Sequence, residues 1–241
     1  MTGSSDTTFV LTSCGRFDLL AETMLTFLAC NTAPIARHVV VEDSGSASVR
    51  DVLGGLDVPI DILLNQPPVG QMASIDAAYA TVATLFVFHC EDDWRFLRGG
   101  FVEESRAVLD ARDDVSVVVC RRNGQNVDHD ALVASASVER VAGVGVRIPR
   151  LDAHPLWGGY TFNPGLRRHA DWERAAPLAA YRQEAGASLW FKSQRMRCAF
   201  LEEPACETTG QFRHVRNART PKSPELQRME ALAARDAASG K

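Results

Sequence analysis

The sequence lacks the features that mark several large classes of protein. Its six cysteines are scattered and form no CxxC pair, which argues against a zinc knuckle or a disulfide framework. Lysine and arginine number 26 against 30 aspartates and glutamates, which argues against broad nucleic-acid binding. The first residues lack the basic and apolar stretches of a signal peptide, and no apolar run is long enough to span a bilayer. These absences predict a cytoplasmic protein with no transmembrane segment and no nucleic-acid partner.

The composition is that of an ordinary globular protein. Hydrophobic residues make up 46% and charged residues 23% of the 241 residues, which is enough to build a sizeable core. Cys90 and Cys120 lie in apolar runs, where we expect reduced thiols packed in the core. The length suits one large domain, or one domain with a small appendage.

Short β-branched runs alternate with helical patterns in the first half of the chain. The expected strands span residues 8–13, 38–42, 60–64, 85–88 and 115–119. Apolar residues three or four apart predict helices after the first and third of these strands, and another helix is expected over 101–111. Strands this apolar, separated by helices, predict an α/β fold with a mostly parallel, Rossmann-like sheet that helices cover on both faces.

The second half is less regular. Residues 124–174 are rich in glycine, proline and aromatic residues, and they suggest a variable region or lid. A helical stretch is expected over 176–194 and a strand over 198–201.

The end of the chain, from residue 219, is polar and alanine-rich. Leu226, Met229 and Leu232 form one apolar helical stripe, which predicts either a helix packed on the body or on a partner, such as a second copy, or a loose tail. We therefore expect three segments, 1–122, 123–218 and 219–241.

Polar residues follow the expected strands at their carboxyl ends, where ligands bind in a parallel α/β sheet. Thr12, Ser13, Cys14 and Arg16 follow the first strand and offer hydroxyls, backbone donors and a guanidinium to a phosphate. A simple helix entry would have the same pattern. Asp43 follows the second strand and suits a base edge or a ribose hydroxyl, although an Asp turn is an equal alternative.

The strongest signal is the acidic run Glu91-Asp92-Asp93 after the fourth strand. Three acids directly after a buried strand are electrostatically costly unless a cation or hydrogen-bond donors compensate them. Carboxylate oxygens suit Mn²⁺ or Mg²⁺, which commonly bridge carboxylates and substrate phosphates. A solvated acidic turn is the alternative. His89, just before the run, is expected to point into the sheet and to be hydrogen-bonded.

With these strand ends in order, the first 120 residues resemble the nucleotide-binding half of GT-A fold glycosyltransferases, especially the large inverting family 2 type of bacterial sugar transferases. The resemblance implies that the Thr12 to Arg16 segment and Asp43 bind the donor nucleotide. The segment from Asn65 through Gly70 to Gln71 is similar to the family's link into the helix before the metal strand, so these three residues also fall on the donor side.

The acidic run departs from the family's Asp-x-Asp motif, because Glu91 takes the place of the first acid. The resemblance implies that Asp93 ligates the metal, and that Glu91 and Asp92 contact the donor. It further implies that a late histidine, His214, serves as a metal or phosphate ligand.

The resemblance implies that 1–122 is the nucleotide-sugar-binding half and 123–218 the acceptor-binding, catalytic half. Beyond residue 120 it weakens, because acceptor regions diverge within the family. Inverting members carry an acid at the start of a helix that faces the acceptor, and Glu184 is the candidate for this general base. Asp171 and Glu173 are reserve candidates. The aromatic segment 157–165 either stacks on an acceptor ring or forms a buried turn.

These implications describe a metal-dependent enzyme that moves a sugar from a nucleoside-diphosphate sugar, such as a UDP-sugar, to a hydroxyl-bearing small molecule or saccharide, with inversion. Two alternatives use the same kinds of residue. One is a nucleotidyltransferase, and the other is a non-catalytic protein that binds nucleotide sugars on the same scaffold.

Overall fold

The protein is described by a computed structural model that covers residues 5–124, 127–210 and 213. The strands are β1 (Thr7–Ser13), β2 (Arg37–Glu42), β3 (Ile60–Leu64), β4 (Phe86–Glu91), β5 (Trp94–Phe96), β6 (Val115–Val119), β7 (Val138–Val141), β8 (Val144–Arg147), β9 (Gly165–Arg168), β10 (Arg197–Leu201) and β11 (Cys206–Thr208). The helices are α1 (Phe17–Cys30), α2 (Val49–Leu53), α3 (Gln71–Tyr79), α4 (Phe101–Ala111), α5 (Val127–Ala134), α6 (His169–Ala175), α7 (Glu184–Ser193) and the 3₁₀ helix η1 (Leu178–Tyr181). The strands expected from the apolar runs are confirmed as β1, β2, β3, β4, β6 and β10.

In the described part of the chain, nine strands form one sheet in the order β3-β2-β1-β4-β9-β6-β10-β8-β7. The pairings of β1 with β2 and β4, of β2 with β3, and of β6 with β10 are parallel. Strand β9 is antiparallel to both β4 and β6, and β8 is antiparallel to β10 and β7. Only β8 and β9 therefore run against the other strands of the sheet as described, which confirms the mostly parallel sheet.

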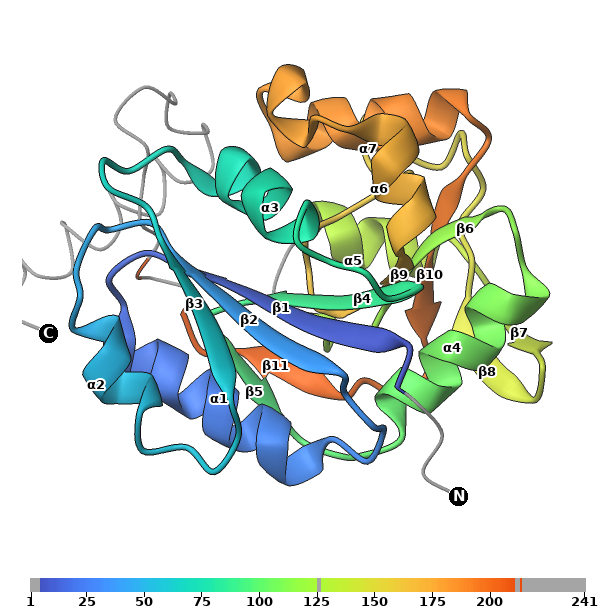
Figure 1. Ribbon diagram of the computed structural model, residues 1–241. Coiled ribbons are helices and arrows are strands. Elements are labelled where there is room, and N and C mark those ends of the chain that lie inside the picture. The colour runs from blue at the N-terminus through green and yellow to red at the C-terminus, as the bar shows by residue number, and fades with distance from the viewer. Residues whose placement is uncertain (1–4, 125–126, 211–212, 214–241) are drawn as a thin grey trace, which may run out of the picture.

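Helices cover both faces of this sheet (Figure 1). Helices α1, α2 and α4 pack on one face, and α3, α5, α6 and α7 pack on the other. Within β1, Phe9 and Leu11 belong to the first core while Val10 belongs to the second, as alternation along a strand requires. The α/β architecture predicted from the apolar runs is confirmed. Within the described residues, no helix combines the length and the hydropathy needed to cross a membrane.

Strand β9 is the element that the sequence pattern did not indicate. It has four residues, of which Arg167 and Arg168 are charged, so it lacks the apolar run of the other central strands. It nevertheless lies between β4 and β6 in the middle of the sheet. Gly165 permits this close packing, because a Cβ at that position would lie 2.3 Å from the carbonyl oxygen of Val118.

The helical stretch expected over 176–194 is present but interrupted. The chain forms η1 and then α7, and Arg182 between them has a left-handed backbone with φ of 63°. This break leaves Glu184 as the first residue of α7 rather than a mid-helix residue. It therefore determines where the candidate base lies.

A second, two-stranded sheet pairs β5 with β11 in an antiparallel register. Trp94 opens β5 and is 4% exposed in the core, so it fills the interior beneath the acids. Because β5 directly follows the acidic run, this pairing brings β11 back beside that run (Figure 1).

Candidate active site

The carboxyl ends of β1, β2 and β4 lie next to one another, as the parallel sheet requires. The register pairs Thr12 of β1 with Glu91 of β4, and Ser13 of β1 with Glu42 of β2. Residues as far apart in sequence as Thr12 and Glu91 thus meet at the carboxyl ends of the strands. This is the edge at which ligands bind in open α/β sheets.

Arg16 joins the loop after β1 to the acidic run. Its guanidinium forms a salt bridge with Asp92 and donates to Oδ2 of Asp93 at 2.9 Å. Asp92 also accepts from the Ser13 hydroxyl at 3.1 Å and from the Cys14 amide at 3.4 Å, and it is 1% exposed. The structure therefore brings together the two residue groups that the sequence placed on the donor side.

Asp43 organises the loop that precedes α3. Its carboxylate accepts from Asn65 Nδ2 at 2.9 Å and from the backbone amides of Val69 and Gly70, each at 2.8 Å. Gly70 has a φ of 92°, a backbone conformation that favours glycine. Asp43, Asn65 and Gly70 are thus gathered as predicted, but the carboxylate of Asp43 is already bound by its own chain. Nucleotide binding by Asp43 stays a prediction.

Glu42, the last residue of β2, is a further residue at this end of the sheet and was not among the predicted site residues. It is fully buried, and its Oε1 accepts from the amides of Gly15 at 2.9 Å and Ser44 at 2.8 Å. Its Oε2 has no hydrogen-bond partner in the described part of the chain. Its position as the last residue of a buried strand was the signal that could have identified it.

Glu184, the first residue of α7, is a further carboxylate close enough to the acidic run to act on Glu91. Its Oε1 accepts from the Thr161 hydroxyl at 2.6 Å and from the Phe162 amide at 3.0 Å. Burial raises the pKa of Glu184, while these two hydrogen bonds and the charges of Arg167 and Arg121 lower it. The structure therefore holds this carboxylate in a fixed orientation inside the site.

The acids repel one another across the site. The pKa of Glu91 is raised to about 8, first by burial and then by the charges of Asp93, Glu184 and Asp92, with Arg16 acting in the opposite direction. Glu184 thus lies within electrostatic range of Glu91. Gln71 Nε2 donates to Glu91 Oε1 at 2.6 Å, which links the start of α3 to the same carboxylate.

The reserve candidates lie near the amino-terminal ends of the parallel strands, at the end of the sheet opposite the acidic run. Strand β9 runs against β4, so its last residue, Arg168, pairs with Phe86 at the start of β4. Asp171 follows in α6 and bonds Arg168 at 3.3 Å, while Glu173 is exposed and 3.7 Å from His169. Both acids are therefore far along the strand from Glu91, which makes Glu184 the better candidate.

The chain after β11 runs beside the acidic run. Thr209 N donates to the carbonyl of Asp93 at 2.8 Å, and a Cβ at Gly210 would lie 2.5 Å from the side chain of Asp93. Arg213 pairs with Asp18 at the start of α1. His214, predicted as a metal or phosphate ligand, lies outside the described residues.

Several side chains near the site belong to the core. Tyr160 and Phe162 are 2% and 1% exposed, so the segment 157–165 forms a buried aromatic cluster at these positions rather than an acceptor platform. His89 is buried as expected, but the expectation of a hydrogen bond is wrong, because neither ring nitrogen has a partner in the described part of the chain. Cys90 and Cys120 are buried free thiols, as predicted.

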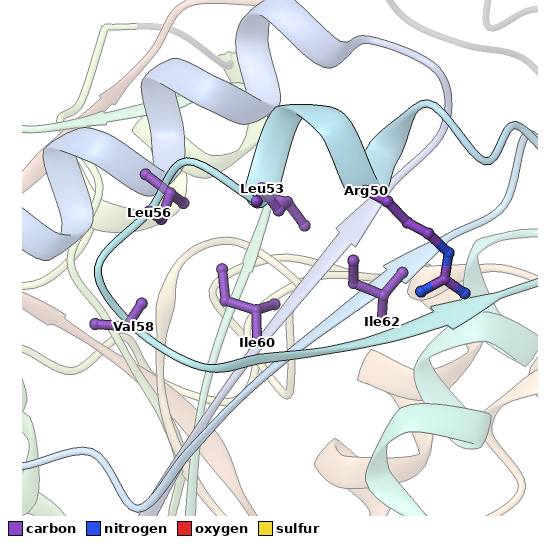
Figure 2. Close-up of a pocket in the computed structure, with 7 residues that line it drawn as sticks. Arg50, Leu53, Leu56, Val58, Ile60 and Ile62 are labelled. Atoms are coloured by element: carbon purple, nitrogen blue, oxygen red, sulfur yellow. The ribbon is translucent and has the colours of Figure 1, made fainter.

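A pocket of about 170 Å³ lies away from these groups, between α2 and the edge strand β3 (Figure 2). Its side-chain lining is apolar apart from the guanidinium of Arg50, and it includes Leu53, Leu56, Val58, Ile60 and Ile62. None of the candidate site residues lines it. It is therefore separate from the edge that carries the acids.

The donor set fits a divalent cation that shares its ligands with a substrate. The described residues contain no group of three or more His, Cys, Asp or Glu side chains arranged to hold a metal ion alone. Mg²⁺ and similar ions, however, are commonly held by one or two carboxylates together with substrate phosphates. Burial is the largest cause of the raised pKa of Glu91, and the charges of Asp93, Glu184 and Asp92 raise it further. Asp93 is less engaged than Asp92, since within the described residues its side chain accepts from Arg16 alone while Asp92 also accepts from Ser13 and Cys14.

Replacing Arg16 with methionine should destabilise the fold by about 3 kcal/mol, because a buried Asp92 would lose its cation. The free energy of unfolding in urea, measured without added metal, checks this. Arg150, whose side chain is 82% exposed in its pair with Asp152, provides the matched control, and Arg150→Met should leave the unfolding midpoint nearly unchanged. Equal shifts for the two variants would contradict the role of Arg16.

The fold and the polar edge together place the chain in the class of GT-A fold proteins, as the sequence resemblance predicted. No protein-family model matches the sequence, and no curated protein matches it either. Among solved structures, the fold is similar to the mannosyltransferase PcManGT from Pyrobaculum calidifontis in complex with GDP-Man and Mn²⁺, with a TM-score of 0.61 and 12% identity. That match covers 88% of this chain and 59% of the mannosyltransferase.

The fold is also similar to S. aureus TarS. TarS 1-349 in complex with UDP-GlcNAc matches with a TM-score of 0.60 and 15% identity over 93% of this chain and 66% of that one. TarS 1-349 without a named ligand matches with a TM-score of 0.59 and 15% identity over 84% of this chain and 60% of that one. The chain therefore spans about 60% of the length of the first of these structures. At such identities the likeness shows the fold.

Proposed function

We propose that the protein is a glycosyltransferase that moves a sugar from a nucleoside-diphosphate sugar to a hydroxyl acceptor, with a divalent cation and with inversion. The observation that carries the proposal is the meeting of the Arg16 loop, the Asp93 run and Glu184 at the carboxyl edge of a GT-A sheet. Ligands named for the similar structures, GDP-Man with Mn²⁺ and UDP-GlcNAc, support this class of donor.

The donor side binds the nucleoside diphosphate. Asp93 would hold Mn²⁺ or Mg²⁺, which when bound neutralises charge on the leaving diphosphate. Arg16 adds a fixed positive charge at the start of α1, where anions are favoured, while the Cys14 and Gly15 amides beside it donate to Asp92 and Glu42. His214 is proposed as a further ligand to the metal or the phosphates.

The acceptor side supplies the base. Thr161 and Phe162 both donate to Oε1 of Glu184, so the carboxylate is held in one orientation and Oε2 takes the proton of the acceptor hydroxyl. The acceptor oxygen then bonds to the anomeric carbon while the bond from that carbon to the diphosphate breaks, and the nucleoside diphosphate leaves with the electron pair. A single displacement of this kind inverts the anomeric centre.

The test is a screen of UDP- and GDP-sugars with the purified protein, with and without MnCl₂, followed by chromatography of the nucleotide products. We expect slow, manganese-dependent hydrolysis of at least one donor, with water as the acceptor and a nucleoside diphosphate as the product. In a parallel assay with a nucleoside triphosphate and a sugar 1-phosphate as substrates, release of pyrophosphate would instead support a nucleotidyltransferase. Binding of a donor with no turnover under any condition would support the non-catalytic alternative.

A further inference from the structure

Arg167 is a buried cation that the proposed chemistry does not use. It lies on β9 in the centre of the sheet, is 1% exposed, and heads the set of largest fully buried side chains. None of the carboxylates in the described part of the chain forms a salt bridge with it. Burying a guanidinium without a counter-ion is costly, so its hydrogen bonds must provide the compensation.

Those hydrogen bonds all go to one short segment of the chain. Nη1 donates to the Tyr160 hydroxyl at 3.0 Å and to the carbonyl of Thr161 at 3.2 Å. Nη2 donates to the carbonyls of Asn163 at 3.1 Å and Gly165 at 3.3 Å. The planar fork of one arginine therefore fixes residues 160–165, the segment that leads into β9.

The same segment holds the candidate base. The Thr161 hydroxyl and the Phe162 amide are the two groups that donate to Glu184 Oε1, at 2.6 and 3.0 Å. Arg167 bonds the backbone carbonyl of Thr161, so only one residue separates the guanidinium from the carboxylate along this chain of contacts. Glu184 itself lies at the start of α7, on a different element, and depends on the segment for its orientation.

We propose that Arg167 is a positioning residue for Glu184, acting through the segment 160–165, whose Thr161 hydroxyl and Phe162 amide hold the carboxylate. This role rests on the proposed function of Glu184 as the general base. The positive charge of Arg167 also lowers the pKa of Glu184, which favours the ionised carboxylate that a base requires.

Replacing Arg167 with lysine separates the contribution of its charge from that of its hydrogen bonds. Arg167→Lys keeps a positive charge in the core but cannot reproduce a fork that reaches four oxygen atoms on separate residues. We expect kcat for donor hydrolysis to fall by about 10- to 100-fold, since small errors in the placement of a reacting group have effects of this size. The affinity for the released nucleoside diphosphate with Mn²⁺ should not change, because the donor side is built from other residues.

A double-mutant cycle with Glu184→Gln tests whether Arg167 acts through Glu184. If it does, Arg167→Lys should lower kcat in the wild-type background and have little further effect in the Glu184→Gln background. An equal fall in both backgrounds would overturn the positioning role. If the wild-type protein hydrolyses no donor, the proposed function itself fails, and that result is distinct from an unchanged kcat in an active Arg167→Lys variant.

Thr161 provides a second route if Arg167→Lys does not fold. Thr161→Val removes the hydroxyl that donates to Glu184 while keeping the shape of the side chain, and Thr161→Ser keeps the hydroxyl. We expect Thr161→Val to lower kcat by about 10-fold or more and Thr161→Ser to retain most of the activity. Equal activity of the two variants would overturn the proposed chain of contacts.

Discussion

Replacing Asp93 with asparagine is expected to lower manganese-dependent release of nucleoside diphosphate by about 10³-fold, because stabilisation of the leaving group by a metal is typically worth several kcal/mol. The substitution changes little else. Asparagine has the same shape, so it fits beneath Gly210, and its side-chain oxygen can still accept from Arg16. The rate of product release at saturating donor, measured over a range of MnCl₂ concentrations, checks this.

Asp110→Asn is the matched control for this variant. Asp110 is a partly exposed residue of α4 that pairs with Arg106, on an element that covers the sheet rather than its carboxyl edge. It should retain wild-type activity. A melting temperature for Asp93→Asn close to that of the wild type would show that the loss is not caused by unfolding. Full activity of Asp93→Asn at low manganese would show that Asp93 is not a metal ligand.

The parts of the fold that the sequence predicted are those in which local pattern and burial agree. Val39, Val40 and Val41 are fully buried because a parallel strand is covered on both faces, and this gives the unbroken apolar run that indicates β2. Once such strands are identified, the site follows from topology, because all their carboxyl ends meet at one edge. Glu91 and Asp43 could therefore be placed without any knowledge of the packing.

The parts that were missed depend on contacts between residues distant in sequence. Strand β9 carries Arg167 and Arg168 in the middle of the sheet. The guanidinium of Arg168 donates hydrogen bonds to the carbonyls of Leu109 and Arg112, more than 50 residues away. No local pattern records such partners. In the same way, the fixed orientation of Glu184 depends on Thr161, which is 23 positions earlier.

The acidic run shows why position alone did not settle how its charge is balanced. The sequence predicted that a cation or hydrogen-bond donors must compensate the three acids, and the structure supplies donors for two of them through Arg16. Asp92 is further satisfied by Ser13 and Cys14. Glu91 has Gln71 as a neutral donor and keeps a pKa raised to about 8. Asp92 and Asp93 share the single cation Arg16, so a bound cation would add compensation at Asp93.

Replacing Glu184 with glutamine is expected to lower kcat by about 10²- to 10⁴-fold, the usual contribution of a general base. Glutamine can accept the hydrogen bonds of Thr161 and Phe162, so the segment 160–165 should keep its conformation. Because burial raises the pKa of Glu184 and so disfavours its ionised form, the neutral side chain should leave the melting temperature unchanged or raise it. If the Glu184→Gln variant is stable and binds nucleoside diphosphate but turns over slowly, Glu184 has a chemical rather than a structural role.

Glu173→Gln provides the control with the same chemical change. Glu173 is an exposed acid of α6, and its element follows β9 at the edge of the sheet opposite Glu91. Distance along the strands excludes it from a reaction at the Asp93 edge, so kcat should not change. If Glu173→Gln were the slow variant and Glu184→Gln the active one, the acceptor would have to bind at the other end of the sheet. The pair of substitutions therefore tests at which edge the reaction takes place as well as which residue acts as the base.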